Sequence, residues 1–333
     1  MTEPLLEVKG LAKQFRVRST TGAWRDLMAV DDVSFSVRPG EVVAIVGESG
    51  SGKSTTGLAA LRLIEPTSGS VTFEGTDFLA LSPRALRAAR GSIQAIFQDP
   101  RGQLDPRVKI AETVAEPIRA QGVTDRQRIR TRVGEVLELV GLPTEFARRY
   151  PSQLSGGQRQ RVGIARALAP EPKLILCDEA VSALDVSVQT QVLNVLRRLR
   201  ADLGVSYMFI SHGMAAVRYL ADTVVVMYSG REVETSPAEE FFAGPAHPYS
   251  AALLSAVPSV DPGSGRERIV LRGEMPSPFV QRPGCVFADR CSQAQEVCRV
   301  NTPPRVTIGP GRTVSCFFPL QGAGGPTPVG HDS

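Results

Sequence analysis

The chain has 333 residues, of which 42% are hydrophobic and 22% charged, and these values are ordinary for a soluble globular protein. Lys and Arg total 38 against 34 Asp and Glu, so the net charge of +4 is small and its scattered basic residues do not indicate a nucleic-acid partner. No apolar run approaches the roughly 18 residues of a membrane span, and the N-terminal residues lack the pattern of a secretory signal. We therefore expect a cytosolic chain that reaches membranes only through partner proteins.

Short apolar runs alternate with helix-favouring stretches along much of the chain. The runs expected to form strands are 41–46, 173–177, 205–210 and 223–228, and the expected helices are 55–63, 188–203 and 214–220. Strands that alternate with helices in this way predict an α/β domain with a largely parallel sheet.

Other regions have a different composition. Between Gln98 and Pro170, periodic stretches rich in Arg, Glu and Leu, such as 126–140, predict a helical insert. Beyond about residue 235 the chain is rich in Pro and Gly, which predicts a small irregular appendage, and the Gly/Pro-rich end at 321–333 is expected to be disordered.

A phosphate-binding loop follows the first apolar run. Gly47-Glu-Ser-Gly-Ser-Gly-Lys-Ser54 matches the pattern G-x-x-x-x-G-K-[ST] between a strand and a helix. Glycines let backbone N–H groups and the helix N-terminus face a phosphate, Lys53 supplies a positive charge, and the Ser54 hydroxyl is a ligand for Mg²⁺. The residues expected to bind nucleotide here are Gly47, Glu48, Ser49, Gly50, Ser51, Gly52, Lys53, Ser54 and Thr55.

An acidic pair, Asp178-Glu179, ends the second apolar run. Ligands gather at the carboxyl ends of strands in open α/β sheets, so Asp178 is expected to bind Mg²⁺ and Glu179 to polarise the attacking water as a general base. Such a pair alone is weak support, because acidic residues at strand ends are often helix caps. Together with the phosphate-binding loop it predicts a nucleotide hydrolase.

The stretch Leu154-Ser-Gly-Gly-Gln-Arg-Gln-Arg161 resembles the signature motif of ATP-binding-cassette (ABC) ATPases. The order of the other motifs is similar to that family as well, over residues ~5 to ~235. The resemblance implies a P-loop ABC ATPase domain, with a RecA-like core, an antiparallel β subdomain and the helical insert. It also implies a head-to-tail dimer that holds two ATP molecules at its interface.

The resemblance assigns roles to residues outside the phosphate-binding loop. Phe15 is expected to stack on adenine, although tyrosine is commoner there, and Gln98 to contact Mg²⁺ and the attacking water and to relay the nucleotide state to membrane subunits. The implied catalytic set is Lys53, Gln98, Glu179 and His212, and the implied Mg²⁺ ligands are Ser54, Gln98 and Asp178.

The remaining implied contacts cross the dimer interface. The signature residues expected to bind the ATP of the opposite protomer are Ser155, Gly156, Gly157 and Gln158. Asp185 is expected to cross the interface, and His212 to hydrogen-bond the γ-phosphate. Two residues depart from the family pattern without removing a catalytic side chain: Ala180 stands where proline is usual, and Gly213 where many members have an acid.

Four further segments are similar to the oligopeptide/dipeptide importer branch of the family, a group that also includes nickel importers. These segments are 97–106, Glu116-Pro117, 246–254 and Pro276-Ser-Pro278. We therefore expect an ATP-hydrolysing subunit that energises peptide import, with a nickel or other small-solute importer, or a non-transport ABC ATPase, as alternatives.

The importer resemblance also implies where the chain works and with which partners. Two transmembrane permeases, a second identical or homologous ABC ATPase and, through the complex, an extracellular solute-binding protein are the implied partners, and nucleic acid is not among them. The implied place is the cytoplasmic face of the inner membrane, as a peripheral subunit.

Four of the five cysteines lie in the last 50 residues, with the spacing C-x5-C-x6-C-x17-C: Cys285, Cys291, Cys298 and Cys316. In a cytosolic protein such a group favours a metal site over disulfides, and four thiolates suit either a [4Fe–4S] cluster or zinc. The C-x2-C pairs of common zinc ribbons are absent, and members of the resembled family carry a cluster here, so a [4Fe–4S] cluster is expected, with zinc or bare thiols as alternatives. The expected division is a nucleotide-binding domain at 1–235 (insert at about 99–170), a small cysteine-rich domain at 236–320 and a tail at 321–333.

Overall fold

The computed structural model describes residues 3–18, 22–98, 102, 104–182, 184–256, 269–271, 273, 279 and 283–320. The chain divides into two compact units: the first takes residues 1–7, 36–44 and 70–220, and the second takes 8–35, 45–69 and 221–333. The segment Pro276-Ser-Pro278, part of the stretch 97–106 and the tail 321–333 lie outside the described residues. The boundary expected at residue 235 stays a prediction.

Parallel strands form the centre of the first unit. Strand β7 (Leu174–Asp178) pairs in parallel with β6 (Ile93–Ile96) on one side and β8 (Ser206–Ile210) on the other, with Leu174 opposite both Ile93 and Ser206. The apolar residues of β7 and β8 are fully buried, which explains why these strands occur as unbroken apolar runs in the sequence. The runs 173–177 and 205–210 are confirmed as strands.

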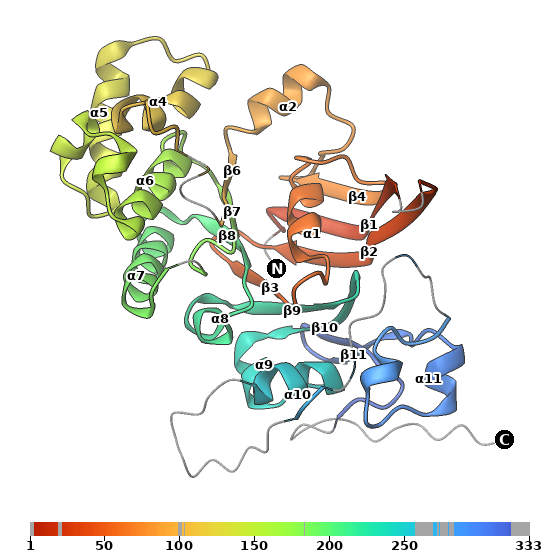
Figure 1. Cartoon of the computed structure of the whole chain (residues 1–333). Coiled ribbons are helices and arrows are strands. Elements are labelled where there is room, and N and C mark those ends of the chain that lie inside the picture. Colours follow the sequence, from red (N-terminus) through yellow and green to blue (C-terminus); the bar gives the residue numbers. More distant parts are fainter. Residues whose placement is uncertain are drawn as a thin grey trace. The chain divides into compact units, whose positions relative to one another are not determined.

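The first unit also contains most of the helices. They are α2 (Pro83–Ala89), α4 (Ile110–Ala120), α5 (Arg126–Leu139), α6 (Gly156–Leu168), α7 (Val186–Leu203) and α8 (Met214–Leu220), with the 3₁₀ turns η1 (Thr144–Arg148) and η2 (Pro151–Gln153). Helices α4, α5 and α6 pack against one another (Figure 1), so the helical character expected between Gln98 and Pro170 is confirmed. The short strand pair β4 (Ser68–Phe73) and β5 (Thr76–Asp77) is antiparallel.

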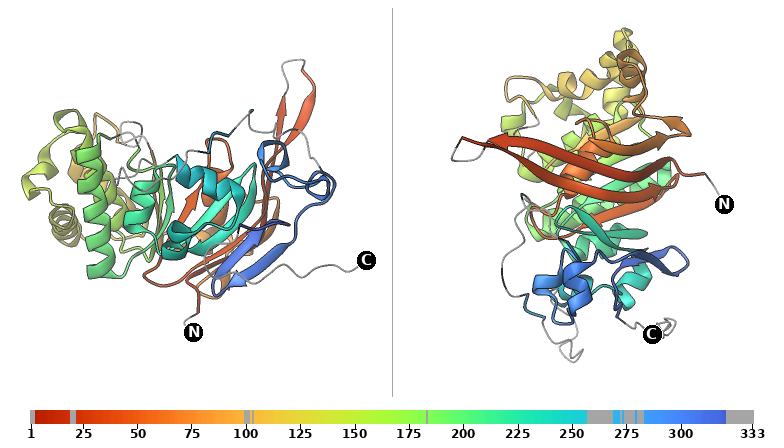
Figure 2. Two further views of the ribbon diagram at one scale, coloured as in Figure 1. Left: turned by 90° about the horizontal axis from the view of Figure 1, so that it is seen from below. Right: turned by 90° about the vertical axis from the view of Figure 1, so that its right-hand side faces the viewer.

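The second unit is built on antiparallel strands. Two long strands, β1 (Leu6–Arg18) and β2 (Trp24–Val37), run side by side (Figure 2). Elsewhere in this unit β9 (Thr223–Tyr228), β10 (Arg231–Pro237), β12 (Arg312–Ser315) and β11 (Arg305–Gly309) pair in that order. Helix α1 (Lys53–Ala60) follows strand β3 (Val42–Val46), whose residues are divided between the two units.

The region after residue 235 is more regular than its composition predicts. It contains α9 (Ala238–Ala243), α10 (Pro248–Ser255), η3 (Ala288–Arg290) and α11 (Glu296–Val300), besides β11 and β12. Two of its prolines start helices instead of breaking them, because Pro237 precedes α9 and Pro248 is the first residue of α10. No helix in the described part of the chain is long and apolar enough to cross a membrane.

Candidate nucleotide-binding site

The phosphate-binding loop joins β3 to α1 and depends on glycine at two positions. Gly47 and Gly52 have φ angles of 152° and 98°, a backbone conformation that residues other than glycine rarely adopt. A Cβ atom on Gly47 would lie 2.2 Å from the Met227 carbonyl oxygen, and one on Gly52 would lie 2.3 Å from that of Ala29. Neighbouring backbone therefore excludes any larger residue at either position.

Internal hydrogen bonds close the loop around the lysine. The Lys53 side chain is 5% exposed, and its Nζ atom donates to the carbonyl oxygens of Gly47 at 2.9 Å and Glu48 at 2.7 Å. The Ser51 amide donates to the same Glu48 oxygen at 3.2 Å. The ammonium group is thus held over the turn of the loop, where an approaching phosphate would meet it together with backbone amides.

Two residues that sequence reasoning missed hold Glu48 in place. The Tyr249 hydroxyl accepts a hydrogen bond from the Glu48 amide at 2.8 Å, and Arg290 forms an ion pair with the Glu48 carboxylate at 2.7 Å. Tyr249 lies within the segment 246–254 that resembles the importer branch, but nothing in that pattern connects it to the loop.

The acidic pair lies at the carboxyl end of β7, as expected from the sequence. Asp178 is the last residue of the strand. Glu179 has a left-handed φ of 48°, and its amide donates to the Ile210 carbonyl of β8 at 3.0 Å. The Nδ1 atom of His212 lies 3.4 Å from the Oε1 atom of Glu179, so these two side chains meet at the edge of the sheet where ligands bind.

Gln98 belongs to the same cluster. It follows β6, the strand parallel to β7, and its Nε2 atom donates to the Ser182 hydroxyl at 3.3 Å. That hydroxyl in turn donates to the Glu179 carbonyl at 2.9 Å. Strand pairing and this short chain of hydrogen bonds therefore bring Gln98, Glu179 and His212 together.

The signature residues form the N-terminus of α6. The Ser155 hydroxyl accepts from the Gln158 amide at 3.3 Å, and the Gln158 side chain accepts from the Ser155 amide at 2.9 Å, which is a capping box. A Cβ atom on Gly157 would lie 2.4 Å from Cγ1 of Val188 in α7, so glycine allows the two helices to pack. The first turn of α6 keeps backbone amides that can bind an anion.

Asp185 caps the N-terminus of α7. Its carboxylate accepts from the Ser187 hydroxyl at 2.7 Å and from the Val188 amide at 3.0 Å. These hydrogen bonds, that of Ser187 most of all, lower the pKa of the Asp185 carboxyl. Asp185 thus fixes the start of the helix that packs against the signature helix.

The expected site residues are distributed over the two units. Phe15 and residues 47–55 belong to the second unit. Gln98, residues 155–158, Asp178, Glu179, Asp185 and His212 belong to the first. Phe15 lies in β1, with the Lys13 ammonium 4.9 Å from its ring centroid.

Comparison with known proteins decides the family. Residues 30–182 match the model of the ABC transporter family, and residues 233–298 match that of the oligopeptide/dipeptide transporter C-terminal region. The chain is 49% identical over 318 residues to a putative peptide import ATP-binding protein of Brucella ovis, which covers 95% of this chain and 99% of that protein. It is 44% identical over 321 residues to an oligopeptide transport ATP-binding protein of Bacillus subtilis, with 95% and 98% covered. The chain belongs to the ATP-binding proteins of the ABC transporter family.

Solved structures agree with this assignment of the fold. A dimeric ATP-binding cassette, MJ0796, in a post-hydrolysis state bound to ADP and Pi is 29% identical, with a TM-score of 0.62 over 70% of this chain and 98% of that one. A cbiO1 protein of Clostridium perfringens, part of an ABC transporter complex, is 28% identical with a TM-score of 0.63, over 72% and 91%. The protein is therefore an ABC ATPase, for which ATP and Mg²⁺ are the expected ligands.

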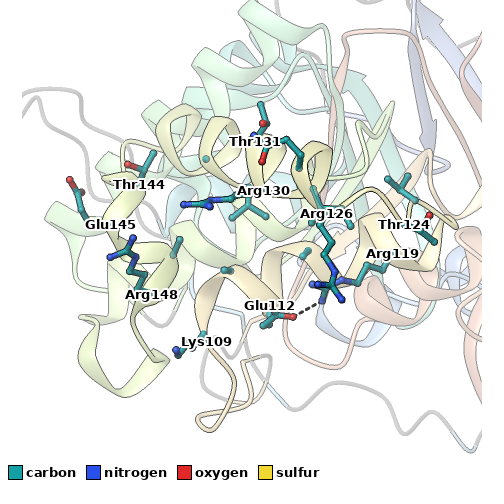
Figure 3. A pocket seen from close by; sticks show the side chains of 18 residues that line it. Lys109, Glu112, Arg119, Thr124, Arg126, Arg130, Thr131, Thr144, Glu145 and Arg148 are labelled. Carbon is teal, nitrogen blue, oxygen red and sulfur yellow. Dashed lines mark hydrogen bonds and ion pairs between the residues drawn. The ribbon is translucent and has the colours of Figure 1, made fainter.

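The ABC ATPase also has a cavity of about 1270 Å³ between α4, α5 and η1 (Figure 3). The charged side chains that line it are Lys109, Glu112, Arg119, Arg126, Arg130, Glu145 and Arg148. Arg119 forms an ion pair with Glu112 at 2.6 Å, which lowers the pKa of the Glu112 carboxyl. None of the expected nucleotide-binding residues lines this cavity, so the catalytic motifs lie elsewhere.

The four C-terminal cysteines of the ABC ATPase lie around one small cavity of about 20 Å³. Its lining includes Cys285, Cys291, Cys298 and Cys316, together with His247 and Phe287. Burial raises the pKa of the Cys316 thiol to about 12, and the neighbouring thiols add to the rise. His247 caps α10 by accepting a hydrogen bond from the Tyr249 amide at its Nδ1 atom (3.1 Å).

The arrangement of these thiols does not support a metal site as it stands. Among the residues that the structure describes, no group of three or more His, Cys, Asp or Glu side chains could hold a metal ion. The 20 Å³ cavity has room for about one water molecule, so a four-iron cluster would require the thiols to move apart. The expectations of a [4Fe–4S] cluster, of zinc and of a separate cysteine-rich domain thus remain unsupported.

Proposed function

We propose that this ABC ATPase hydrolyses ATP to energise peptide import across the cytoplasmic membrane through two transmembrane permeases. The observation that carries the proposal is the pair of family models on one chain, the second of which, at residues 233–298, is that of oligopeptide/dipeptide transporters. Relatives whose names specify peptide or oligopeptide transport cover 95% of the chain, which favours peptides over nickel as the cargo. A peripheral position on the cytoplasmic face of the inner membrane follows from this role.

The structure suggests how each motif takes part in hydrolysis. Lys53 and the amides of loop 47–55 would bind the β- and γ-phosphates, and the residues that would hold Mg²⁺ are Ser54, Gln98 and Asp178. Glu179 polarises the attacking water as general base, and His212, 3.4 Å from it, hydrogen-bonds the γ-phosphate. The buried Lys53 ammonium and its two carbonyl partners support the first of these roles.

The second half of the site comes from a partner ATPase, identical or homologous, in a head-to-tail dimer. The N-terminus of α6, with Ser155, Gly156, Gly157 and Gln158, binds the γ-phosphate of the partner's ATP. We propose that Asp185 faces the same interface; the support is that it caps α7, the helix that packs on Gly157. ATP-driven closure of this dimer rearranges the permeases, and hydrolysis resets it. An extracellular solute-binding protein delivers the peptide.

For the C-terminal segment we propose a structural metal site at the four cysteines, a [4Fe–4S] cluster with zinc as the alternative, in a domain at 236–320. The proposal starts from the one cavity that all four thiols line, which would have to widen before a metal could bind. Iron, sulfide and zinc analysis of protein purified without oxygen tests the proposal, and protein that holds neither metal would overturn it.

Gentle detergent extraction of the tagged chain from its native membranes tests the main proposal. Two multi-span permeases are expected to co-purify, together with ATPase activity that the Lys53→Ala variant lacks. Peptide uptake by cells that carry only the Lys53→Ala variant should fall to background. Unchanged peptide uptake in those cells, or recovery of the chain with ribosomal proteins alone, would contradict the importer function.

A further inference from the structure

Glu48, the second residue of the phosphate-binding loop, is held by two side chains from the C-terminal region. The Tyr249 hydroxyl, 201 residues away in sequence, accepts from the Glu48 amide at 2.8 Å. The Arg290 guanidinium, 242 residues away, donates to both carboxylate oxygens of Glu48 at 2.7 and 3.1 Å. The loop is thus bonded at one residue through both its backbone and its side chain.

Arg290 forms a bidentate, largely buried ion pair with Glu48. The Arg290 side chain is 8% exposed and that of Glu48 30%. Arg290 Nη1 also donates to the Tyr228 hydroxyl at 3.3 Å, and the hydrogen bond to Glu48 raises the pKa of the guanidinium further above its usual value. A planar fork with two bonds to one carboxylate fixes the direction of that carboxylate as well as its charge.

Aromatic packing connects Tyr249 to the region that bears the cysteines. The Tyr249 ring lies 5.3 Å from that of Phe287, and both contact Tyr228, at 4.7 and 5.2 Å between ring centroids. Phe287 lines the four-cysteine cavity. Tyr249 therefore belongs to a packed cluster that extends from the loop to that cavity.

Arg290 is connected to the same cavity by the backbone. It is the last residue of η3 and is followed directly by Cys291, which lines the cavity. The amide of Arg290 donates to the Phe287 carbonyl at 3.0 Å. Both side chains that hold Glu48 are thus attached to segments that form the cysteine cavity.

We propose that Arg290 and Tyr249 are positioning residues of the nucleotide site, through which the C-terminal segment sets the affinity of the loop for ATP. The inference rests on the proposed ATP-binding role of residues 47–55. The Glu48 carbonyl accepts from the Lys53 ammonium at 2.7 Å and from the Ser51 amide at 3.2 Å. A shift of Glu48 therefore displaces the charge and an amide that bind phosphate.

The test is to measure the Kd for ATP, and KM and kcat for hydrolysis, in the full-length chain and its variants. Arg290→Met and Tyr249→Phe are each expected to raise Kd and KM by about tenfold and to leave kcat within about twofold, since they act on binding geometry. Arg290→Lys should have an ATP affinity between those of Arg290→Met and the wild type, because an ammonium group cannot form the bidentate hydrogen bonds that a guanidinium forms with a carboxylate. Because Arg290 acts through Glu48, the double variant Glu48→Gln/Arg290→Met should bind ATP about as weakly as Arg290→Met alone.

A matched control lies in the same segment. Arg299 forms an ion pair with Asp289 at 3.3 Å, with both side chains 52% exposed, so Arg299→Met removes an arginine without touching Glu48 and should bind ATP like the wild type. If Arg290→Met does not fold, the nearly isosteric Tyr249→Phe carries the test. Wild-type affinity in the folded Arg290→Met or Tyr249→Phe variant would overturn the inference. A wild-type chain that does not bind ATP would instead overturn the proposed function.

Discussion

The Nδ1 atom of His212 lies 3.4 Å from the Oε1 atom of Glu179, where β8 and β7 end side by side. Glu179 adopts a φ of 48°, a conformation that costs a non-glycine residue about 1 kcal/mol or more. The hydrogen bond from its backbone amide to the Ile210 carbonyl stabilises this conformation. Backbone strain at a residue of this kind occurs most often at functional sites. The contact with His212 and the strained backbone support the proposal that Glu179 is the general base.

The Glu179→Gln substitution keeps the shape of the side chain and removes the carboxylate that we propose as general base. ATP binding should persist, while kcat should fall by roughly 10² to 10⁴, the usual contribution of a general base. Binding is measured by equilibrium titration with ATP, and turnover by phosphate release. Glu138→Gln, at an exposed position of α5, is the control and should turn over at the wild-type rate. Near-normal turnover in Glu179→Gln would remove Glu179 from the mechanism.

Gly157 determines how closely α6 approaches α7. A Cβ atom there would lie 2.4 Å from Cγ1 of Val188, and valine is stiff in a helix, so Gly157→Ala should destabilise the protein by about 1–3 kcal/mol. Adding Val188→Ala removes the obstructing methyl groups and should restore most of the loss. Urea denaturation monitored by circular dichroism measures both variants.

Gly134 supplies the control for this prediction. It lies within α5, where an added Cβ would meet only the Thr144 methyl at an ordinary 3.7 Å. Gly134→Ala should therefore stabilise the helix by about 0.5–1 kcal/mol. If Gly157→Ala were as stable as Gly134→Ala, close packing of α6 on α7 would not be the reason for glycine at position 157.

The sequence predicts best what is local. The loop 47–54 and the pair Asp178-Glu179 are contiguous patterns next to apolar runs, and each lies where its pattern places it. The partners of Glu48 could not be predicted, because no short-range pattern links a loop residue to Tyr249 or Arg290 some 200 or more residues later. The spacing of the four cysteines predicted that they would lie together, and in the fold they line one cavity. The spacing gives no information on the size of that cavity. The high proline content wrongly predicted an irregular region after residue 235, because proline is also common at the start of helices.

Gly52 tests the steric argument for the phosphate-binding loop. Gly52→Ala introduces a Cβ atom 2.3 Å from the Ala29 carbonyl at a φ of 98°, so the loop must change its path. We expect ATP affinity to fall by at least about tenfold, and stability by about 2–4 kcal/mol. Gly40→Ala is the matched control, because φ is 72° there but nothing lies within 4 Å of the added atom. It should cost only about 1 kcal/mol of backbone strain and leave ATP affinity unchanged.

The Asp185 cap of α7 makes a pH-dependent contribution to stability whose sign follows from its pKa. Hydrogen bonds from Ser187 and Val188 lower the pKa of the folded carboxyl below its unfolded value, so the folded state favours the ionised form. The stabilisation is complete above the unfolded pKa of about 3.9 and is lost as the pH falls through the lower, folded pKa. Asp185→Asn keeps an acceptor for the helix amides but lacks the charge, so it should be less stable than the wild type at pH 7.

Urea midpoints of the wild type and Asp185→Asn, measured from pH 7 down to pH 3, test this contribution. The difference in urea midpoint between the two proteins should be constant from pH 7 to about pH 5. It should become smaller below about pH 4, because protonation of Asp185 then removes the charge from the wild type as well. Asp202→Asn, in the last turn of the same helix, should not lower stability at pH 7, since a negative charge there opposes the helix dipole. A gap that stayed constant down to pH 3 would mean that the Asp185 charge does not stabilise the cap, and that hydrogen-bond geometry alone does.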